Sequence, residues 1–444
     1  MPIIRPRTPV GVMELLPPDQ IAFQRMMDTI RRGFERFGFL PIETPVFEHT
    51  DVLLTKSGGD TEKQVYFVQS NGALKQQRIH GKPDELPDLA LRFDLTVPSA
   101  RYVAEHEQKL TFPFRRYQMQ RVYRGESAQR GRFREFYQCD IDVIGKDELA
   151  LDYDAEIPCV VADIFRELDI GKFTISLNNR KLLSGLLDRF GITDQTAVLR
   201  EIDKLDKRGR DAVIDTLAAE PFAIDRSILH RLFDVLTAKD TFDVWSKIKF
   251  EEPNSKLAQG VAELREVIEG MRAYGLPEDT YRVDLTIARG LDYYTGTVYE
   301  THLDDHPQLG SICSGGRYDN LAGHYTKSKL PGVGISIGLT RLFDQLRKTV
   351  PSLIDVSILN LGHRSERLRL AKVCRSVGLS VQMQYEAVGI KRQLTVASRM
   401  GAKLCLIYGD AEHQEGIVSV KNMETGVQTP VPIVALRGTI CGLM

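Results

Sequence analysis

The sequence predicts an α/β protein: an α+β domain built on a mainly antiparallel sheet, a helical insertion, and a C-terminal α/β domain with a small mixed sheet. Three observations predict this architecture. Strand-like runs rich in aromatic residues and arginine fill residues 89–145, and strand-like segments return over residues 281–303. Polar amphipathic helices with few strand signals occupy residues 180–275. Strands alternate with helices over residues 355–444.

The N-terminal region contains one amphipathic helix. Pro17 and Pro18 predict its start, and Asp19 is its candidate N-cap. Apolar side chains then recur at helical spacing, at Phe23, Met26, Ile30 and Phe34. Gly38 ends the helix, and an extended segment follows over residues 39–48. A helix of this kind packs its apolar side on the rest of the domain.

The middle of the chain contains further helices and strands. A helix is predicted over residues 150–169 and a strand over residues 173–177, before the helical insertion. Beyond the insertion, residues 311–316 are predicted to form a turn. Residues 333–346 are typical of a strand that runs into a helix, and a break at residues 349–352 indicates a linker.

In the C-terminal tail, residues 355–444, predicted strands alternate with predicted helices. Three strands are predicted, over residues 356–361, 379–385 and 403–408. A basic helix that ends at Gly378 lies between the first two strands, and a helix that ends near Gly401 lies between the last two. A hairpin turns at residues 424–426. Mainly parallel strands joined by right-handed helical crossovers can form a domain that folds alone.

Composition excludes several classes of protein. The 444 residues are 42% hydrophobic and 27% charged, which is typical of globular domains and not of collagen-like, low-complexity or disulfide-rich chains. The 59 lysines and arginines nearly balance the 60 acidic residues. This sum hides two basic stretches, with seven arginines against one acid in residues 115–134 and 11 basic against seven acidic residues in residues 355–444. The near-zero net charge is therefore no argument against a polyanionic partner.

Cysteine and histidine spacing argues against a metal site. The six cysteines are widely spaced without a C-x-x-C pair, so reduced and mostly buried thiols are expected. There is no H-E-x-x-H motif, and no protein-bound zinc is expected. No apolar run approaches the roughly 18 residues of a membrane-spanning helix, and the N-terminus lacks the apolar run of a signal peptide. We expect a cytoplasmic protein without a membrane partner.

The most informative stretch is an arginine-rich hairpin over residues 115–142. Alternating residues predict two antiparallel strands, joined by a glycine-containing, arginine-rich loop. So many guanidinium groups repel one another unless an anion lies between them. Their planar forks suit phosphate and carboxylate oxygens, and the neighbouring aromatic rings suit a stacked base. A phosphate or nucleotide site is favoured over a solvated charged hairpin, which is the usual role of a charge run.

Two further segments carry polar groups that a ligand could use. Asp94 and Thr96 are predicted to point the same way from an extended segment, where they could hold an ammonium or a ring N–H. An aspartate at a strand end is more often a cap or a turn former. Glycines bracket an arginine, an aspartate and two tyrosines in residues 289–296, which allows either the close approach of a ligand or a simple hairpin.

Two glycine-rich segments also leave alternatives open. Residues 314–319 are predicted to form a loop that a ligand can approach, or merely a Gly-Gly turn. Arg341 follows a strand with regularly spaced glycines and lies near a helix start. The small residues there could permit close packing, or could leave room for a flat ligand with Arg341 as an anion clamp.

Taken in order, these segments resemble the class II aminoacyl-tRNA synthetases, and within them the histidyl-tRNA synthetase family. Residues 38–48 resemble class II motif 1, residues 123–136 resemble motif 2, and residues 334–341 resemble motif 3. Residues 289–300 and 314–319 resemble the two histidine-specific signatures. The resemblance spans nearly the whole chain.

The resemblance implies a histidine–tRNA ligase. Such an enzyme activates L-histidine with ATP to histidyl-adenylate, and then transfers histidine to the 3′ end of tRNA(His), with ATP as a substrate accompanied by Mg²⁺. No general base is required, because a carboxylate is already ionised at neutral pH. Positioning and cations that stabilise charge on the phosphoryl oxygens would carry the catalysis.

The resemblance also implies the site residues. Arg124 and Arg289 would be catalytic, each reaching the α-phosphate of ATP. The ATP side would consist of Arg124, Glu126, Arg132, Phe136 and Arg341, with the Phe136 ring stacked on adenine. Histidine would be held by Asp94, Thr96, Arg124, Gln138, Asp142, Arg289, Tyr293 and Tyr294. The acceptor end of the tRNA would contact Gln129 and Arg130.

Domain organisation and assembly follow from the same resemblance. Residues 1–350 would form the catalytic domain, with the insertion at about 180–275, and residues 355–444 the anticodon-binding domain. The segment around Pro45 would contribute to a homodimer. One departure is that residues 8–14 lack the G-T-x-D form common near the start of this family, which affects only the strand that the resemblance implies for this N-terminal segment and not the site.

Two other functions fit a synthetase-like chain. A catalytically inactive regulatory subunit of ATP phosphoribosyltransferase usually loses the arginine at position 289 and the C-terminal domain, and this chain has both. A module that senses uncharged tRNA would be attached to a kinase, and no kinase signature is found. The active ligase is therefore favoured over both.

Overall fold

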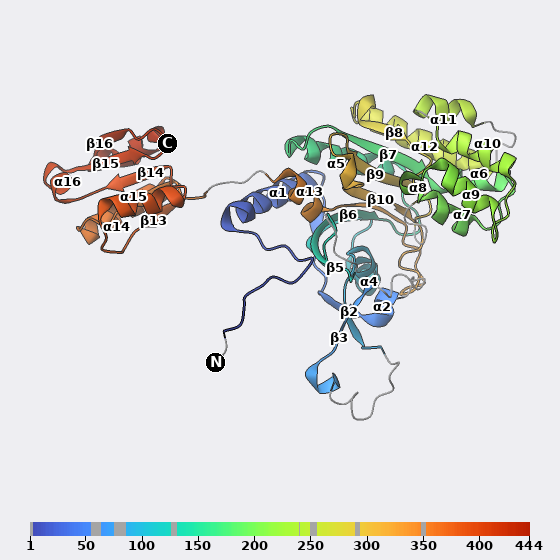
Figure 1. The fold of residues 1–444 in the computed structure, drawn as a ribbon, viewed down its shortest axis with the longest axis horizontal. Helices are drawn as coiled ribbons and strands as arrows, with labels where there is room; N and C mark the ends of the chain where they lie inside the picture. The colour runs from blue at the N-terminus through green and yellow to red at the C-terminus, as the bar shows by residue number, and fades with distance from the viewer. Residues whose placement is uncertain are drawn as a thin grey trace. The chain divides into compact units, whose positions relative to one another are not determined.

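The computed structural model describes residues 3–54, 64–74, 86–125, 131–238, 240–248, 255–288, 294–347 and 352–444 (Figure 1). Contacts divide the chain into two compact units. The larger one holds the N-terminal segment up to residue 14 together with residues 26–346, and the smaller one holds residues 15–25 and 347–444.

The larger unit is built on a sheet of eight strands within the described residues, in the order β1-β5-β6-β11-β10-β9-β7-β8. Their bounds are Leu40–Pro41 for β1, Phe114–Tyr123 for β5, Glu135–Ile144 for β6, Gly332–Ile337 for β11, Cys313–Tyr318 for β10, Thr297–Leu303 for β9, Phe173–Asn179 for β7 and Tyr281–Val283 for β8. Only the two edge pairings, β1 with β5 and β7 with β8, are parallel. The predicted mainly antiparallel sheet is confirmed.

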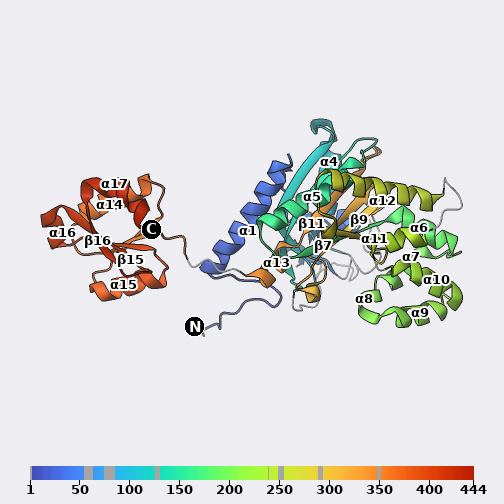
Figure 2. The same cartoon turned by 90° about the horizontal axis from the view of Figure 1, so that it is seen from above.

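Helices cover one face of this sheet (Figure 2). They are α1 (Pro17–Arg36), α5 (Asp152–Glu167), α12 (Lys256–Ala273) and α13 (Leu339–Leu346). Ile30 and Phe34 of α1 are fully buried, as their spacing predicts. The helix begins at Pro17, so Asp19 lies in its first turn and the predicted N-cap position is wrong. An acidic residue in the first turn still interacts favourably with the helix dipole.

The opposite face of the sheet is approached by a smaller layer. A three-stranded sheet has the order β2-β4-β3, with β2 at Phe47–His49, β3 at Tyr66–Val68 and β4 at Leu89–Leu91. Two helices accompany it, α2 (Thr50–Leu54) and α4 (Thr96–His106). The buried Arg92 guanidinium donates to the Thr44 carbonyl at 2.7 Å and the Arg121 carbonyl at 2.9 Å. Arg92 therefore fastens the segment before β2 to strand β5.

The insertion is helical, as predicted. Besides α12 it contains α6 (Arg180–Arg189), α7 (Gln195–Ile202), α8 (Leu205–Arg208), α9 (Arg210–Ala218), α10 (Arg226–Leu236) and α11 (Thr241–Lys247). Polar side chains cap most of these helices, because an N-terminal turn has backbone N–H groups without helical partners. The capping residues are Asn179, Asp194, Asp225, Asp240 and Ser255.

Helices α6 and α12 pack closely through two glycines. A Cβ atom added at Gly260 would collide with the backbone of Leu182, and one added at Gly185 would collide with the backbone of Leu257. In an open helical position Gly→Ala stabilises a helix by about 1 kcal/mol. Here we expect Gly260→Ala to destabilise the larger unit by about 1–3 kcal/mol in urea unfolding, because overpacking displaces backbone. Gln259→Ala, on the exposed side of α12, is the control and should have no such effect.

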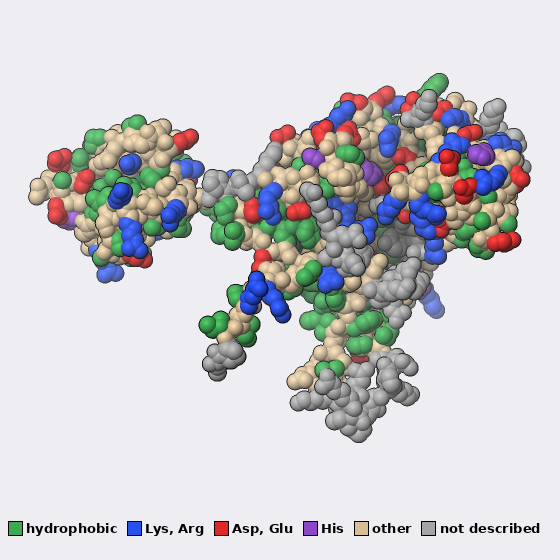
Figure 3. Space-filling model, in the orientation of Figure 1, with side chains coloured by type: hydrophobic (Ala, Val, Ile, Leu, Met, Phe, Trp, Pro, Cys, Tyr) green, Lys and Arg blue, Asp and Glu red, His purple; other side chains and the backbone are tan. Residues whose placement is uncertain are grey.

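The smaller unit contains a five-stranded sheet in the order β13-β12-β14-β15-β16. The strands are β12 (Val356–Ile358), β13 (Val381–Met383), β14 (Leu404–Ile407), β15 (Ile417–Asn422) and β16 (Gln428–Pro432), and the helices are α14 (Arg364–Ser376), α15 (Ile390–Arg399), α16 (Asp410–Glu415) and α17 (Leu436–Thr439). Two pairings are parallel and two antiparallel, so the sheet is mixed, as predicted. Lysines and arginines are spread over the face seen in Figure 3.

Not every basic residue of this unit is on its surface. Arg367 is only 4% exposed, and its guanidinium donates to the backbone carbonyls of Gly362 at 2.6 Å and Gln384 at 3.1 Å. It holds α14 against the loop that follows β13. The basic surface of residues 355–444 is therefore smaller than the residue count indicates.

Two predictions about local structure differ from the structure. Residues 313–316, predicted as a turn, are the first part of β10, because their glycines lie flat against the neighbouring strands and not in a bend. Thr96 begins helix α4, so the extended segment predicted around Asp94 ends before it. Most of the predicted linker at residues 349–352 lies outside the described residues.

Candidate active site

The open face of the large sheet carries a polar surface. Strand register places Asp142 opposite Arg116 on one side and Gly334 on the other. It places Asp140 opposite Gln118 and Ser336 in the same way. Alternate residues of a strand point to opposite faces, so these side chains face away from the helices, while Cys139, Ile141 and Val143 are buried beneath them.

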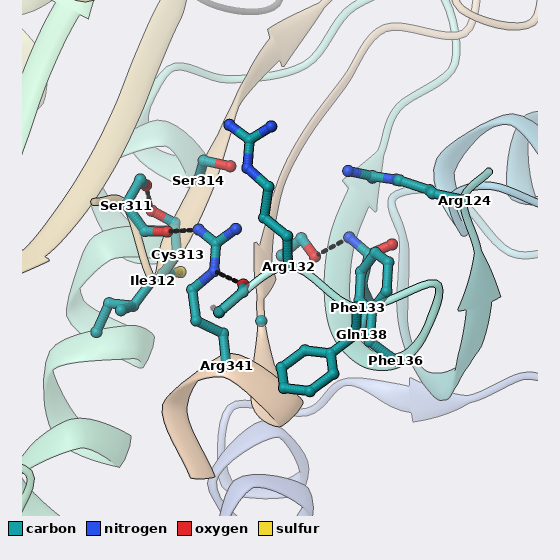
Figure 4. A pocket seen from close by; sticks show the side chains of 13 residues that line it. Arg124, Arg132, Phe133, Phe136, Gln138, Ser311, Ile312, Cys313, Ser314 and Arg341 are labelled. Atoms are coloured by element: carbon teal, nitrogen blue, oxygen red, sulfur yellow. Dashed lines mark hydrogen bonds between the residues drawn. The ribbon is translucent and has the colours of Figure 1, made fainter. Parts of the chain in front are cut away.

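A pocket of about 280 Å³ lies on this open face (Figure 4). Its lining includes three guanidinium groups, of Arg124, Arg132 and Arg341, and two aromatic rings, of Phe133 and Phe136. The Arg124 guanidinium lies over the Phe136 ring at 5.1 Å, and its Nε donates to the Phe93 carbonyl at 3.0 Å. Arg124 is thus held in one orientation with the rest of its fork available to an anion.

Arg341 is also fixed at the rim of the pocket. Its Nε donates to the Gly131 carbonyl at 3.0 Å, and one terminal nitrogen donates to the Ser311 carbonyl at 2.7 Å. The residue lies in the first turn of α13, directly after β11. Its guanidinium therefore joins the end of the arginine-rich hairpin to the start of β10, across the mouth of the pocket.

A second, smaller cavity of about 20 Å³ adjoins the first. The two share Ser314 and Ser336 among their lining residues. The smaller one is also lined by Thr96, Asp140, Asp142, Tyr294, Gly316, Tyr318, Gly334 and Ile335. A Cβ atom at Gly334 would collide with the Asp142 carboxylate, and one at Gly316 would lie 2.9 Å from the Tyr294 ring. Glycine at these two strand positions keeps the cavity open.

A buried charge network forms the wall of this cavity. The fully buried Arg116 makes an ion pair with Oδ2 of Asp142, and the Tyr318 hydroxyl donates to Oδ1 of the same carboxylate at 2.9 Å. Burial raises the pKa of Asp142, and Arg116 and Tyr318 oppose that shift. The network fixes the orientation of the Asp142 side chain.

Asp94 lies at the entrance to helix α4. Its Oδ1 accepts a hydrogen bond from the backbone N–H of Val97 at 3.2 Å, which is the capping role that strand-end aspartates commonly have. Burial raises its pKa to about 6, against the hydrogen bond from Val97 and the charge of Arg124. The side chain is therefore both a structural cap and a buried acceptor near Arg124.

Asp140 also has a strongly perturbed carboxyl. Burial raises its pKa to about 7, although Arg116 opposes the shift and Asp142 and Asp94 add to it. A raised folded-state pKa means that the contribution of Asp140 to stability is full below about pH 4 and is lost as the pH rises to about 7.

This shift predicts a pH-dependent stability. Without substrates, the free energy of unfolding should fall between pH 4 and pH 7, and the fall should be smaller in Asp140→Asn, whose amide does not titrate. Urea unfolding at several pH values measures both. Equal pH dependence in the two proteins would show that Asp140 ionises at its ordinary pKa.

The structure brings most of the predicted residues together. Arg124, Arg132, Phe136, Gln138 and Arg341 line the larger pocket, and Thr96, Asp142 and Tyr294 line the smaller one. Asp94 is buried beside them. The predicted residues Glu126, Gln129, Arg130, Arg289 and Tyr293 lie outside the described residues.

Sequence reasoning missed several contributors. Arg116 and Asp140 were not singled out. Their signal is the alternation within the hairpin, since residues 116, 118, 138, 140 and 142 share one face once the strands are paired in register. Ser314 and Ser336 lie in the two glycine-rich segments discussed above, on β10 and β11, but neither serine was singled out within them. Arg317 of the SGGRYD segment does not face a ligand: its Nε lies 3.0–3.1 Å from both oxygens of the buried Asp154 of α5.

Comparison with known proteins places this site in a family. The model of the histidyl-tRNA synthetase family matches residues 11–342, and an anticodon-binding domain model matches residues 355–441. The chain belongs to the histidyl-tRNA synthetase family. Both the pocket and its smaller neighbour lie inside the matched region.

Relatives and solved structures in the histidyl-tRNA synthetase family resemble the chain along its whole length. Histidine–tRNA ligases of Xanthomonas axonopodis pv. citri and Xylella fastidiosa are each 54% identical, over 99% of this chain and 96% and 98% of their own lengths. The crystal structure of histidyl-tRNA synthetase from Nostoc sp. PCC 7120 is 38% identical, covers all of both chains and superposes with a TM-score of 0.87. The predicted enzyme class, a class II histidine–tRNA ligase, is confirmed.

The alternative function, that of an ATP phosphoribosyltransferase regulatory subunit, is not favoured. A Bacillus halodurans chain described as an ATP phosphoribosyltransferase regulatory subunit/histidyl-tRNA synthetase covers 88% of this chain, with a TM-score of 0.73 and 21% identity. A likeness at this identity shows the histidyl-tRNA synthetase fold alone. The full-length ligases are far more similar to this chain.

Two observations bear on metals and membranes. In the described part of the chain, no group of three or more His, Cys, Asp or Glu side chains could hold a metal ion. His302 and His306 are four residues apart, but His302 lies on strand β9, so they do not share a helical face. Among the described helices, none is both long and apolar enough to cross a membrane.

Proposed function

We propose that the two joined cavities are where histidine and ATP react. The observation that carries this proposal is their opposite character: guanidinium groups surround the larger cavity, and buried carboxylates line the smaller one. A nucleotide polyphosphate suits the first, and an amino acid with an ammonium and a polar ring suits the second. Ser314 and Ser336 stand where the two substrates would meet.

The chemistry needs few groups from the protein. A carboxylate oxygen of histidine attacks the α-phosphorus of ATP, the bond to the bridging oxygen breaks, and pyrophosphate leaves. Charge builds on the α-phosphate oxygens in the transition state, and a fixed guanidinium there stabilises it without reorganisation. We assign this role to Arg124, with Arg289 as the second cation.

The remaining roles on the ATP side are proposed from the family resemblance, and for Arg132, Phe136 and Arg341 also from their place in the lining of the larger pocket. Arg132 and Arg341 would bind the outer phosphates, Phe136 would stack on adenine, and Glu126 would contact the nucleotide. Mg²⁺ bound with ATP would neutralise phosphate charge. Because the described residues offer no cluster of metal ligands, ATP itself would supply most of the contacts to the ion.

The amino-acid side uses the buried polar groups. The Gln138 amide donates to Ser336 Oγ at 2.8 Å, while its buried Oε1 has no hydrogen-bond partner among the described residues. An unpaired buried acceptor costs free energy until a donor arrives. We assign Gln138, Asp94 and Thr96 to the α-ammonium of histidine, and Asp142, Tyr293 and Tyr294 to the surroundings of its ring.

Transfer to tRNA would use both parts of the chain. We propose residues 1–350 as the catalytic domain, with the insertion at about 180–275, and residues 355–444 as the domain that binds the anticodon of tRNA(His). Gln129 and Arg130 would contact the acceptor end. We also propose that the enzyme acts in the cytoplasm.

A homodimer is proposed on a separate observation. Leu40 of β1, Phe47 of β2 and Leu89 of β4 are 60%, 52% and 38% exposed, although large apolar side chains favour burial. A second copy of the chain would cover them. Sedimentation of the purified protein tests this, and Phe47→Glu should shift the dimer toward monomer. A monomeric unmutated protein would contradict the proposal.

Histidine-dependent exchange of pyrophosphate into ATP tests the proposed site. The unmutated protein should exchange with histidine, and Arg289→Ala should reduce exchange by at least about 100-fold, as expected for loss of a cation at the transition state. Aminoacylation of tRNA(His) then tests the second step. Full activity of Arg289→Ala would remove that residue from the mechanism.

A further inference from the structure

The connection from β8 to β9 crosses the carboxyl end of β7. Strand β7 lies between β8, to which it is parallel, and β9, to which it is antiparallel. The chain leaves β8 at Val283 and enters β9 at Thr297, so it has to pass over the end of β7. Arg289, which we assigned as the second cation of the reaction, belongs to this connection. The contacts that hold the connection therefore bear on the position of that cation.

One residue at the end of β7 binds both flanks of this connection. Arg180 is the first residue of α6 and directly follows β7. Its terminal nitrogen Nη2 donates to the Ala288 carbonyl at 3.0 Å, and its backbone N–H donates to the Gly296 carbonyl at 2.8 Å. Ala288 directly precedes Arg289 in the sequence, and Gly296 directly precedes β9. Because a peptide unit is planar, a fixed Ala288 carbonyl also fixes the orientation of the peptide bond that follows it.

A second side chain from the end of β7 holds the same flank. Asn178 is 1% exposed, and its amide nitrogen donates to the carbonyls of Ile287 at 2.9 Å and Leu285 at 3.2 Å. Three carbonyls within residues 285–288 thus accept hydrogen bonds from two side chains of the β7 end. Residues 285–288 belong to no strand or helix, so these side chains replace the backbone ladder that would otherwise fix them.

A structural role alone does not explain an arginine at position 180. Arg180 is 9% exposed, and burying a cation is unfavourable without compensating contacts. It also lies in the first turn of α6, where the helix dipole disfavours a positive charge. Asn179 already caps this helix, since its side chain accepts from the backbone N–H groups of Lys181 and Leu182. The start of α6 therefore gains nothing from a cation, and the bond to the Ala288 carbonyl is a contact that offsets its cost.

We propose that Arg180 is a positioning residue for Arg289 in the attack of histidine on the α-phosphate of ATP. The inference rests on the proposed function, which takes Arg289 as a cation at the transition state. Arg180 lines neither of the two cavities, so it acts through the backbone of the connection and not on a substrate. A misplacement of about 1 Å at a reacting centre can lower a rate by about 100-fold, so a hold of this kind affects catalysis.

The variant Arg180→Met tests this role. It keeps an unbranched apolar side chain and the backbone bond to Gly296, and removes only the donor to Ala288. We expect kcat for histidine-dependent pyrophosphate exchange to fall by about 10- to 100-fold, with the KM values for ATP and histidine changed less than about threefold. Lys181→Met is the matched control: this next residue of α6 is ion-paired with Glu263, its side chain is 35% exposed, and kcat should change less than about twofold.

A double-mutant cycle separates positioning from a general loss of structure. In Arg289→Ala no guanidinium remains to be positioned, so adding Arg180→Met should lower kcat by less than about twofold more. Added to Arg341→Ala, the same change should keep its full effect, because the Arg341 side chain is held by the carbonyls of Gly131 and Ser311. Full losses from Arg180→Met in both backgrounds would overturn the inference.

A second variant keeps the test decisive if Arg180→Met does not fold. Asn178→Ser is too short to reach the carbonyls of Leu285 and Ile287, and it should lower kcat by about 10-fold in the unmutated background and not in Arg289→Ala. Unchanged kcat in the folded variants overturns the role of Arg180 while the proposed function stands. Absence of histidine-dependent exchange in the unmutated protein overturns the proposed function and this inference with it.

Discussion

Replacement of Arg124 by alanine should lower kcat for histidine-dependent pyrophosphate exchange by about 100- to 1,000-fold. The guanidinium is held by the Phe93 carbonyl and the Phe136 ring, so it faces the larger pocket without having to be ordered when ATP binds. Fixed charge of this kind acts mainly on the transition state, where negative charge grows on the phosphoryl oxygens. The KM for histidine should change less than kcat.

The control for Arg124→Ala lies three residues earlier in the same hairpin, on strand β5. Arg121 is 51% exposed, packs over the Tyr137 ring at 5.2 Å and pairs with Glu135. Arg121→Ala removes an equal charge from the same hairpin and should change kcat less than threefold, because exposed charges are screened by solvent. Equal losses in both variants would mean that Arg124 acts only through general electrostatics.

The second large effect concerns stability. Arg317→Met should lower the free energy of unfolding of the larger unit by about 3–5 kcal/mol, because it leaves Asp154 as an unpaired buried charge. Asp154 has no exposed side-chain surface, and Arg317 holds it through Nε and a terminal nitrogen, the latter at 2.6 Å. The pair fastens helix α5 to the centre of the sheet. Urea unfolding followed by circular dichroism measures the loss.

A double variant distinguishes loss of the pair from loss of packing. Arg317→Met combined with Asp154→Leu removes both charges, and replacing a whole buried pair by apolar groups is often neutral. We expect the double variant to recover at least half of the stability lost in Arg317→Met. No recovery would mean that the hydrogen bonds from Arg317 to the carbonyls of Leu149 and Ala150 matter more than the ion pair.

Much of the fold follows from local patterns. The helix that contains Ile30 and Phe34, the helical insertion and the alternating tail are all predictable, because apolar periodicity and capping residues are properties of short segments. The arginine-rich hairpin is predictable as two strands for the same reason. Where prediction fails, at residues 313–316, glycines lie flat within a crowded sheet instead of in a turn. Only the neighbouring strands impose that choice.

The order of the sequence motifs by itself determined the family, the choice of Arg124 and Arg341 as candidate site residues, and the basic stretches that the near-zero net charge conceals. Tertiary structure alone decided which charges meet. Whether Arg116 pairs with Asp142, whether Arg317 binds a ligand or Asp154, and which side chain holds the Ala288 carbonyl depend on strand register and burial. These properties depend on contacts between segments that are far apart in the chain. The sequence alone does not show whether the partner of a charged residue is another residue of the protein or the substrate.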